Sequence, residues 1–284
     1  MKISILIPTF NNLRYLKFFL NSVKNNSSFQ HEVIVHVNDG SDGTLKYVEK
    51  NNIKFSYSKK NIGLCSSMNM AYKLCTSDLI LYAHDDMYFC KNWDKYLVDE
   101  IKEQKSNFYY LSGTNVSTRF GLINYNCGDT LENFDEDKFL RFCTQDNTPD
   151  LQSSHWAPHL IHRDLWEKIN GFSEEFNPGD GSDPDFCMKL WLENVRIFKG
   201  ISKFKVYHFN SLTTRNNKVK LNNGTKIFLL KYGFNPKFFR KYYLQGNNSI
   251  IPYRGILNEP KNNFFMCIEL IVNKLKYLFY KFKF

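Results

Sequence analysis

The sequence predicts an α/β fold built on a mostly parallel sheet flanked by helices, with a C-terminal helical extension. Two short apolar runs rich in β-branched residues, Ile3 to Ile7 and Val33 to Val37, end at turn residues, as buried strands do. Between them, Leu13 to Val23 carries apolar residues at helical spacing, with Asn11 or Asn12 as candidate N-cap. This order of strand, helix and strand predicts a parallel pair.

The same alternation continues along the chain. Further helices are predicted over residues 44–51 and 65–75, and further strands over residues 54–58 and 79–82. Repeated alternation of strands and helices is typical of one sheet with helices on both faces.

The second half of the chain is less regular. Residues 106–150 are polar and Asn-rich, which predicts irregular structure with a short helix near residues 137–142. A helix over residues 184–193 is expected next, with Asp183 as N-cap and Pro184 at the first helical position. After residue 210 the chain becomes rich in Lys, Asn and aromatic residues, which indicates the helical extension.

Composition narrows the class of protein. With 284 residues, of which 43% are hydrophobic and 17% aromatic, the chain is not of the disordered kind. A net charge of +10 indicates an anionic partner, which charge alone does not identify as nucleic acid, membrane surface or phosphorylated substrate. The seven cysteines are scattered, odd in number and free of any CxxC pair, which favours a reducing cytosol over a disulfide framework or zinc site. No stretch of 18 apolar residues occurs.

Carboxylates follow two of the predicted strands. In parallel sheets, ligands bind at the carboxyl ends of the strands, so the loops after Ile7, Val37 and Tyr82 are expected to meet. The loop with Asp39 precedes a helix, where it is either an ordinary turn or a nucleotide contact. The string from His84 to Asp86 has adjacent carboxylates, which form either a solvated turn or a site for Mg²⁺ or Mn²⁺.

Two later features have equally plain structural explanations. The segment from Gly179 to Asp185 places three carboxylates at a helix start, where capping alone explains Asp183 and Asp185. His208 lies in an aromatic strand, where a buried core histidine is the default interpretation.

Taken together and in this order, the motifs resemble those of the family 2 glycosyltransferases. The resemblance covers residues 1–215 and implies a Rossmann-like GT-A domain there, followed by a helical extension over residues 216–284. The motifs that carry it are Ile7 to Asn12, Asn38 to Ser41, Asn61 to Gly63 with Asn69, His84 to Asp86, Gly171-Phe172, Gly181 to Asp185, and His208.

The resemblance also implies roles for individual residues. It implies Asp183 as catalytic base and Asp86 with His208 as ligands of Mn²⁺ or Mg²⁺. Trp156, whose ring can stack on a sugar or pack as an ordinary half-buried tryptophan, is expected on the acceptor side with Asp185. The nucleotide-binding residues are expected to be Pro8, Thr9, Asn11, Asp39, Asn61, Gly63 and Asp85.

The implied reaction transfers a sugar, with inversion, from a nucleotide diphosphate to a hydroxyl acceptor. A UDP-sugar is the favoured donor, and the acceptor is a glycan, glycolipid or glycoprotein. Departures from the family pattern are His84 in place of an aspartate, Ser182 in place of a glutamate, and Met68 where an arginine is common. These leave an inactive sugar-nucleotide-binding protein as an alternative. A nucleic-acid-binding protein is disfavoured because the aspartate clusters would repel phosphates.

The C-terminal tail predicts an amphipathic helix. Its apolar stripe is flanked by Lys274 and Lys281 on one side and by Lys276 and Lys283 on the other. Such a helix either lies on an anionic membrane surface or packs on protein, and the excess of lysine favours the membrane. The localisation expected is cytoplasmic, with a peripheral position on the inner face of a membrane. The stripe consists of Phe264, Ile268, Ile271, Leu275, Leu278 and Phe282.

Overall fold

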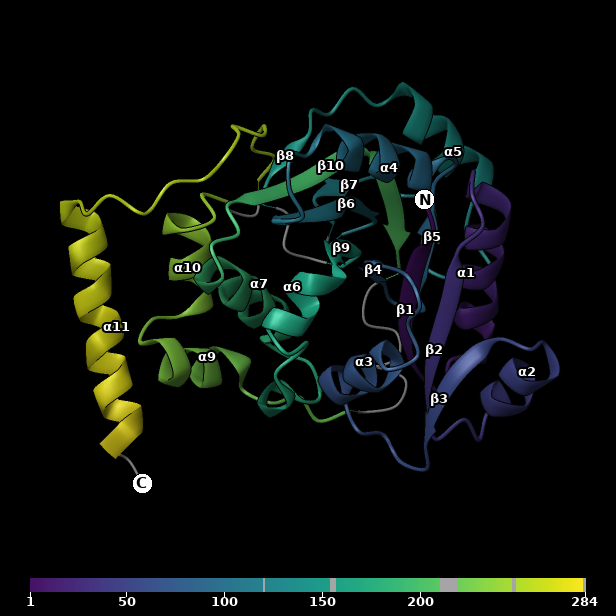
Figure 1. Ribbon diagram of the computed structural model, residues 1–284, viewed down its shortest axis with the longest axis horizontal. Coiled ribbons are helices and arrows are strands. Elements are labelled where there is room, and N and C mark those ends of the chain that lie inside the picture. Colours follow the sequence, from purple (N-terminus) through teal and green to yellow (C-terminus); the bar gives the residue numbers. More distant parts are fainter. Residues whose placement is uncertain (120, 154–156, 210–218, 247–248, 283–284) are drawn as a thin grey trace.

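A ten-stranded mixed sheet runs through the molecule in the computed structural model (Figure 1). The structure describes residues 1–119, 121–153, 157–209, 219–246 and 249–282. Strands β3, β2, β1 and β4 form a parallel half in that spatial order. Their bounds are Ile3–Phe10 for β1, Glu32–Asn38 for β2, Lys54–Ser58 for β3 and Leu79–Tyr82 for β4.

The other half of the sheet mixes directions. Strand β9 pairs antiparallel with both β4 and β6, β6 pairs parallel with β10, and β5 pairs antiparallel with β10. Short strands β7 and β8 pair with β6 and β10. The predicted α/β fold, with a central sheet flanked by helices, is confirmed, and the sheet is mixed because only the half from β3 to β4 is wholly parallel. The bounds are Met87–Phe89 for β5, Tyr109–Ser117 for β6, Ile123–Asn124 for β7, Leu151–Gln152 for β8, His159–His162 for β9 and Ile197–His208 for β10.

Helices cover the sheet. Helix α3 packs on β1 and β2, α4 on β10, and α1 on β5. The apolar side chains of α1 at Leu16, Phe19 and Val23 are buried, which accounts for its predicted amphipathic spacing. The bounds are Leu13–Asn26 for α1, Thr44–Lys50 for α2, Leu64–Tyr72 for α3, Trp93–Glu103 for α4, Glu136–Gln145 for α5, Arg163–Lys168 for α6, Glu174–Phe176 for the 3-10 helix η1 and Ser182–Leu192 for α7.

The prediction of irregular structure over residues 106–150 is wrong in one important place. Strand β6 lies there, and all nine of its residues are buried between β9 and β10. Polar residues such as Ser112, Thr114 and Asn115 conceal the strand in the sequence, although all three are buried inside the fold. Thr114, for example, donates a hydrogen bond to the Ile201 carbonyl at 3.0 Å. The short helix expected in this region is present as α5.

Helix α7 begins earlier than predicted. Its first residue is Ser182 and its N-cap is Gly181, at φ 84°, so Asp183 is not the N-cap and lies inside the first turn. The close approach of another segment explains the glycine. A Cβ on Gly181 would lie 2.8 Å from Cα of Gly224, closer than packed atoms allow.

The C-terminal segment is helical, as predicted. Helix α9 contacts η1, α10 contacts α7, and α11 contacts α9, so the three helices form a layer on one side of the sheet domain. Figure 1 shows α11 at the edge of the molecule, beyond α9 and α10. The expected boundary near residue 215 falls outside the described residues, and the two-domain division stays a prediction. The bounds are Gly224–Tyr232 for α9, Pro236–Tyr242 for α10 and Phe264–Phe282 for α11.

Candidate active site

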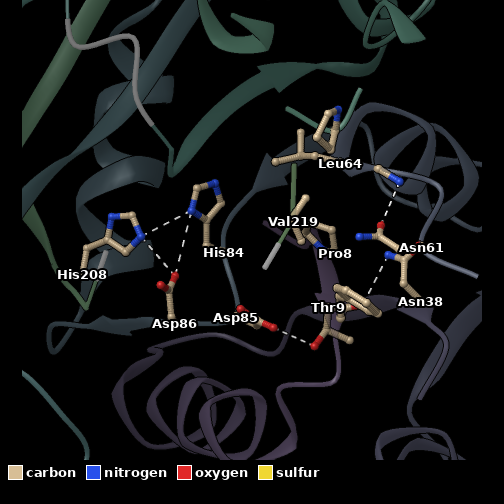
Figure 2. Close-up of a pocket in the computed structure, with 13 residues that line it drawn as sticks. Pro8, Thr9, Asn38, Asn61, Leu64, His84, Asp85, Asp86, His208 and Val219 are labelled. Atoms are coloured by element: carbon tan, nitrogen blue, oxygen red, sulfur yellow. Dashed lines mark hydrogen bonds and ion pairs between the residues drawn. The ribbon is translucent and has the colours of Figure 1, made fainter. Parts of the chain in front are cut away.

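A pocket lies at the carboxyl ends of β1, β2 and β4, where the strand order brings three loops together (Figure 2). Asn38, at the end of β2, and His84 also line it. Asn11, Asp39, Asp183 and Asp185 are not among the lining residues. Seven predicted site residues are among them: Pro8, Thr9, Asn61, Gly63, Asp85, Asp86 and His208.

Asn38 ties the loops of the predicted nucleotide side together. Its side-chain amide donates to Oγ of Ser67 at 2.9 Å, and its Oδ1 accepts from the backbone N–H of Ile62 at 2.9 Å. Asn61 in turn accepts from the N–H of Gly63 at 2.9 Å. These hydrogen bonds connect the loops that form this side of the pocket. The sequence interpretation chose Asp39 as the site residue and did not identify its neighbour Asn38.

Gly63 is required by a close contact with a distant loop. It has φ 84°, and a Cβ there would lie 2.4 Å from Oδ1 of Asn177. The same Oδ1 accepts from the N–H of Cys65 at 3.0 Å, in the first turn of α3. Asn177 was not predicted, because it lies 112 residues from Cys65 in the chain.

Asn11 and Asp39 pair outside the pocket. The Asn11 amide donates to Oδ2 of Asp39 at 3.0 Å, and both residues have positive φ, 47° and 63°. Asparagine and aspartate tolerate this conformation better than other residues with side chains. The contact joins the ends of β1 and β2, and the nucleotide contact of Asp39 stays a prediction.

Asp85 is buried and held by β1. Its Oδ2 accepts a hydrogen bond from Oγ1 of Thr9 at 2.6 Å. Burial raises the pKa of Asp85 to about 7, and the adjacent charge of Asp86 adds to the rise. The carboxyl therefore holds its proton more tightly than an exposed aspartate does.

Three side chains converge at one edge of the pocket. Nε2 of His208 lies 3.0 Å from Oδ1 of Asp86 and 3.3 Å from Nδ1 of His84, as the dashed lines in Figure 2 show. Nδ1 of His84 is 4.0 Å from the same Asp86 oxygen. One atom from each residue can thus be chosen so that all lie within 4.8 Å of one another, close enough to hold a metal ion. The sequence analysis predicted Asp86 and His208 as metal ligands, but it treated His84 only as a departure from the aspartate of the family pattern.

The outer nitrogens of both imidazoles have partners. The hydroxyl of Tyr82 is 2.6 Å from Nε2 of His84, and the amide of Asn115 is 3.1 Å from Nδ1 of His208. Burial lowers the pKa of His84 to about 4, with His208 adding to the effect, so its ring is neutral at pH 7. A neutral imidazole has a lone pair available for a cation.

Asp183 presents a carboxylate with spare hydrogen-bonding capacity. Its Oδ1 is buried and has no hydrogen-bond partner among the described residues. Burial raises the pKa of Asp183 to about 7. The charge of His208 opposes this rise, so the two side chains interact electrostatically. A carboxyl poised near neutral pH and free to accept a proton is suited to act as a base.

Asp185, two residues on, faces the C-terminal segment. Its buried carboxylate accepts a hydrogen bond from the Tyr232 hydroxyl at 2.7 Å and forms an ion pair with Lys231 at 2.8 Å. These contacts attach α9 to the first turn of α7. Its contact with an acceptor stays a prediction, and Trp156 lies outside the described residues.

Residues 4–157 match the model of glycosyl transferase family 2, which is more than half of the chain. The chain belongs to this family. No curated protein sequence matches it. Its pocket, with His84, Asp86 and His208 at the edge, lies at the carboxyl ends of the strands in this family 2 fold.

Solved structures agree on the GT-A fold of this family 2 member. The chain is similar to S. aureus TarS 1-349, with 24% identity and a TM-score of 0.54 over 73% of this chain and 60% of that chain. It is also similar to GalNAc-T7 with UDP, GalNAc and Mn²⁺, with 14% identity and a TM-score of 0.59 over 84% of this chain and 50% of that one. The chain therefore spans about 60% of the TarS chain that it matches.

Proposed function

We propose that this chain transfers a sugar from a nucleotide diphosphate, a UDP-sugar by preference, to a hydroxyl of a glycan, glycolipid or glycoprotein, with inversion and with a divalent metal. The observation that carries the proposal is the convergence of His84, Asp86 and His208 beside a pocket at the strand ends. Structures similar to this one were solved with UDP-GlcNAc, for TarS, and with UDP and Mn²⁺, for GalNAc-T7, which supports a UDP donor.

The residues present fit a divalent ion, which Asp86 and His208 would hold with His84 as a third ligand. If Nε2 of His208 binds the ion, Nδ1 carries the proton and needs an acceptor. Asn115 can supply one, because its Oδ1 is buried without a partner among the described residues while its amide nitrogen faces the ring. The oxygen and nitrogen of a side-chain amide exchange places by a simple flip.

His84 is arranged for binding through Nδ1. The Tyr82 oxygen can accept the proton on Nε2, which leaves the Nδ1 lone pair directed toward Asp86 and His208. Two imidazoles and one carboxylate suit Mn²⁺ better than Mg²⁺, which prefers oxygen ligands. When bound, the ion would supply positive charge opposite the departing diphosphate.

The protein's own groups would do the rest of the chemistry. The loops of Pro8, Thr9, Asn61, Gly63 and Asp85 line the pocket and would orient the nucleotide. An acceptor hydroxyl must lose its proton as it attacks carbon 1, and we assign that proton to the free Oδ1 of Asp183. Direct attack opposite the leaving group inverts the anomeric centre.

The acceptor side would lie near the first turn of α7. Because Asp185 is held by Lys231 and Tyr232, we assign it a positioning role, in which the extension fixes the turn that carries Asp183. Trp156 remains the aromatic residue proposed to stack on an acceptor sugar. The scattered cysteines, odd in number, favour a reducing cytosol as the proposed site of the reaction.

The test is UDP release from UDP-GlcNAc by the full chain with Mn²⁺, compared with the same protein in EDTA. Slow metal-dependent release, with the α-configured donor sugar appearing as a β-configured product by NMR, is the expected result. If the protein bound a sugar nucleotide but released no nucleotide diphosphate from any of several UDP- and GDP-sugars tested, the inactive sugar-nucleotide-binding alternative would be established instead. Release that persists in EDTA would refute the metal assignment.

A further inference from the structure

Helix α11 carries a continuous apolar face that no other described part of the chain covers. Its exposed fractions run from 39% for Leu278 to 76% for Phe282. Contiguous apolar patches of this kind on a protein surface mark contact sites for a partner or a membrane. We propose that this face binds an anionic lipid surface, with the helix lying in the plane of the headgroups. The apolar residues that form the lipid face are Phe264, Phe265, Ile268, Ile271, Val272, Leu275, Leu278 and Phe282.

The helix attaches to the protein by its opposite face. Met266 and Asn273 are buried, and Oδ1 of Asn273 accepts a hydrogen bond from the N–H of Asn235 at 3.0 Å. Further along the same side, Lys226 of α9 lies over the ring of Tyr280 at 5.3 Å. At about 100° per residue, Asn273 lies about half a turn from Leu275. The lipid face therefore points away from the sheet domain, in agreement with the position of α11 in Figure 1.

The charges beside the lipid face favour an anionic surface. Lys274 and Lys281 border it on one side and Lys276 on the other, and all three are exposed. Lysine stems placed there can lie along lipid chains while the ammonium groups reach the headgroups.

A second copy of the chain is a poorer occupant. The only acidic residue of α11 is Glu269, which lies toward the protein and accepts from Lys241 at 2.5 Å and from Tyr242 at 3.1 Å. Two copies joined face to face would bring lysine borders together with no carboxylate of α11 free to offset them. Anionic headgroups supply the missing charge.

The proposal concerns attachment and does not depend on the transfer reaction. None of the residues of the lipid face lines the active-site pocket. Among the residues that the structure describes, no helix is long and apolar enough to cross a membrane.

Co-sedimentation of the full chain with vesicles tests the proposal. Vesicles of phosphatidylcholine mixed with phosphatidylglycerol are expected to bind the protein at low salt, and vesicles of phosphatidylcholine alone to bind it at least tenfold less. The double variant Ile271→Asp and Leu275→Asp should lose binding at least tenfold. Both side chains are more than half exposed, so the fold does not depend on them. The matched control is Ile256→Asp, at another exposed apolar residue outside α11, which should bind like the wild type.

The charge contribution is tested separately. Replacing Lys274, Lys276 and Lys281 with glutamine should weaken vesicle binding severalfold, whereas glutamines at the exposed Lys24, Lys46 and Lys50 should not. Two results would overturn the proposal. One is wild-type protein that stays in solution with anionic vesicles at low salt. The other is a dimer, measured by sedimentation equilibrium, that Leu275→Asp dissociates while vesicle binding is unchanged.

Discussion

Nε2 of His208 lies 3.0 Å from Oδ1 of Asp86, although 122 residues separate them in the chain. The pairing of β10 with β5 creates this contact, since His208 is opposite Met87 in the register and the N–H of Phe209 donates to the carbonyl of Asp86 at 3.1 Å. The strand pairing therefore fixes the separation of these two atoms, which we propose as metal ligands, before any ion binds. Such preorganisation is what a catalytic metal site needs.

Asp86→Ala is expected to lower turnover by at least about 10²-fold, because the diphosphate loses its counter-charge in the transition state. Mn²⁺ affinity, measured by titration calorimetry, should fall in parallel while the far-UV spectrum stays that of the wild type. Asp129→Ala, at an exposed carboxylate away from the pocket, is the control and should change neither quantity. Full activity of Asp86→Ala at saturating Mn²⁺ would refute the assignment.

His84 is expected to contribute nitrogen to the bound ion. Electron spin-echo modulation of Mn²⁺-loaded protein should show two coupled imidazoles in the wild type and one in His84→Ala. The Tyr82→Phe variant should keep both imidazole signals but bind Mn²⁺ about tenfold more weakly, because the His84 ring loses the hydroxyl that orients it. His84→Asp should raise activity with Mg²⁺ relative to Mn²⁺. An unchanged nitrogen signal in His84→Ala would exclude His84 as a ligand and leave the Asp86 prediction standing.

Asp183 should control the pH dependence of turnover. A base must be deprotonated to accept the acceptor's proton, and the pKa of Asp183 is raised to about 7 by burial. The rate is therefore expected to rise with pH and to level off above about 7. Asp183→Asn should lose about 10²- to 10⁴-fold in turnover, together with this pH limb, while donor affinity stays near that of the wild type. A collapse of donor affinity instead would make Asp183 a binding residue.

The Asp183 carboxyl should also make the stability of the fold depend on pH. Stability should fall as pH rises, whereas turnover should rise. Its pKa in the folded state is above the ordinary value of 3.8, so the folded protein binds the proton more strongly than the unfolded chain. Its favourable contribution is complete below about pH 4 and is lost as pH rises to about 7. Urea unfolding of metal-free protein should show the free energy of unfolding of Asp183→Asn rising relative to that of the wild type between pH 5 and pH 8, by about 2–3 kcal/mol. A pH-independent difference would contradict the raised pKa.

The sequence by itself determined the elements whose signals are local. The apolar run from Ile3 and the helical spacing from Leu13 follow from side-chain period, and strands β3 and β4 have the predicted bounds. Because loops after parallel strands must meet at one edge, Thr9 and Asp85 could be placed together from sequence, and they are bonded.

Only the tertiary structure decided what depends on strands and helices far apart in the chain. Strand β6 carries several polar residues, yet all nine of its residues are buried in the sheet, where Thr114 donates a hydrogen bond to the Ile201 carbonyl. Only the structure shows that the carboxylate of Asp185 accepts a hydrogen bond from Tyr232, 47 residues later in the chain. His84 stands where the family pattern has an aspartate, yet contacts with Tyr82 and His208 orient its imidazole ring toward Asp86. Local period encodes which residues form a strand. Which strands become neighbours is set by burial of the whole sheet, and that order brings Asp86 to His208.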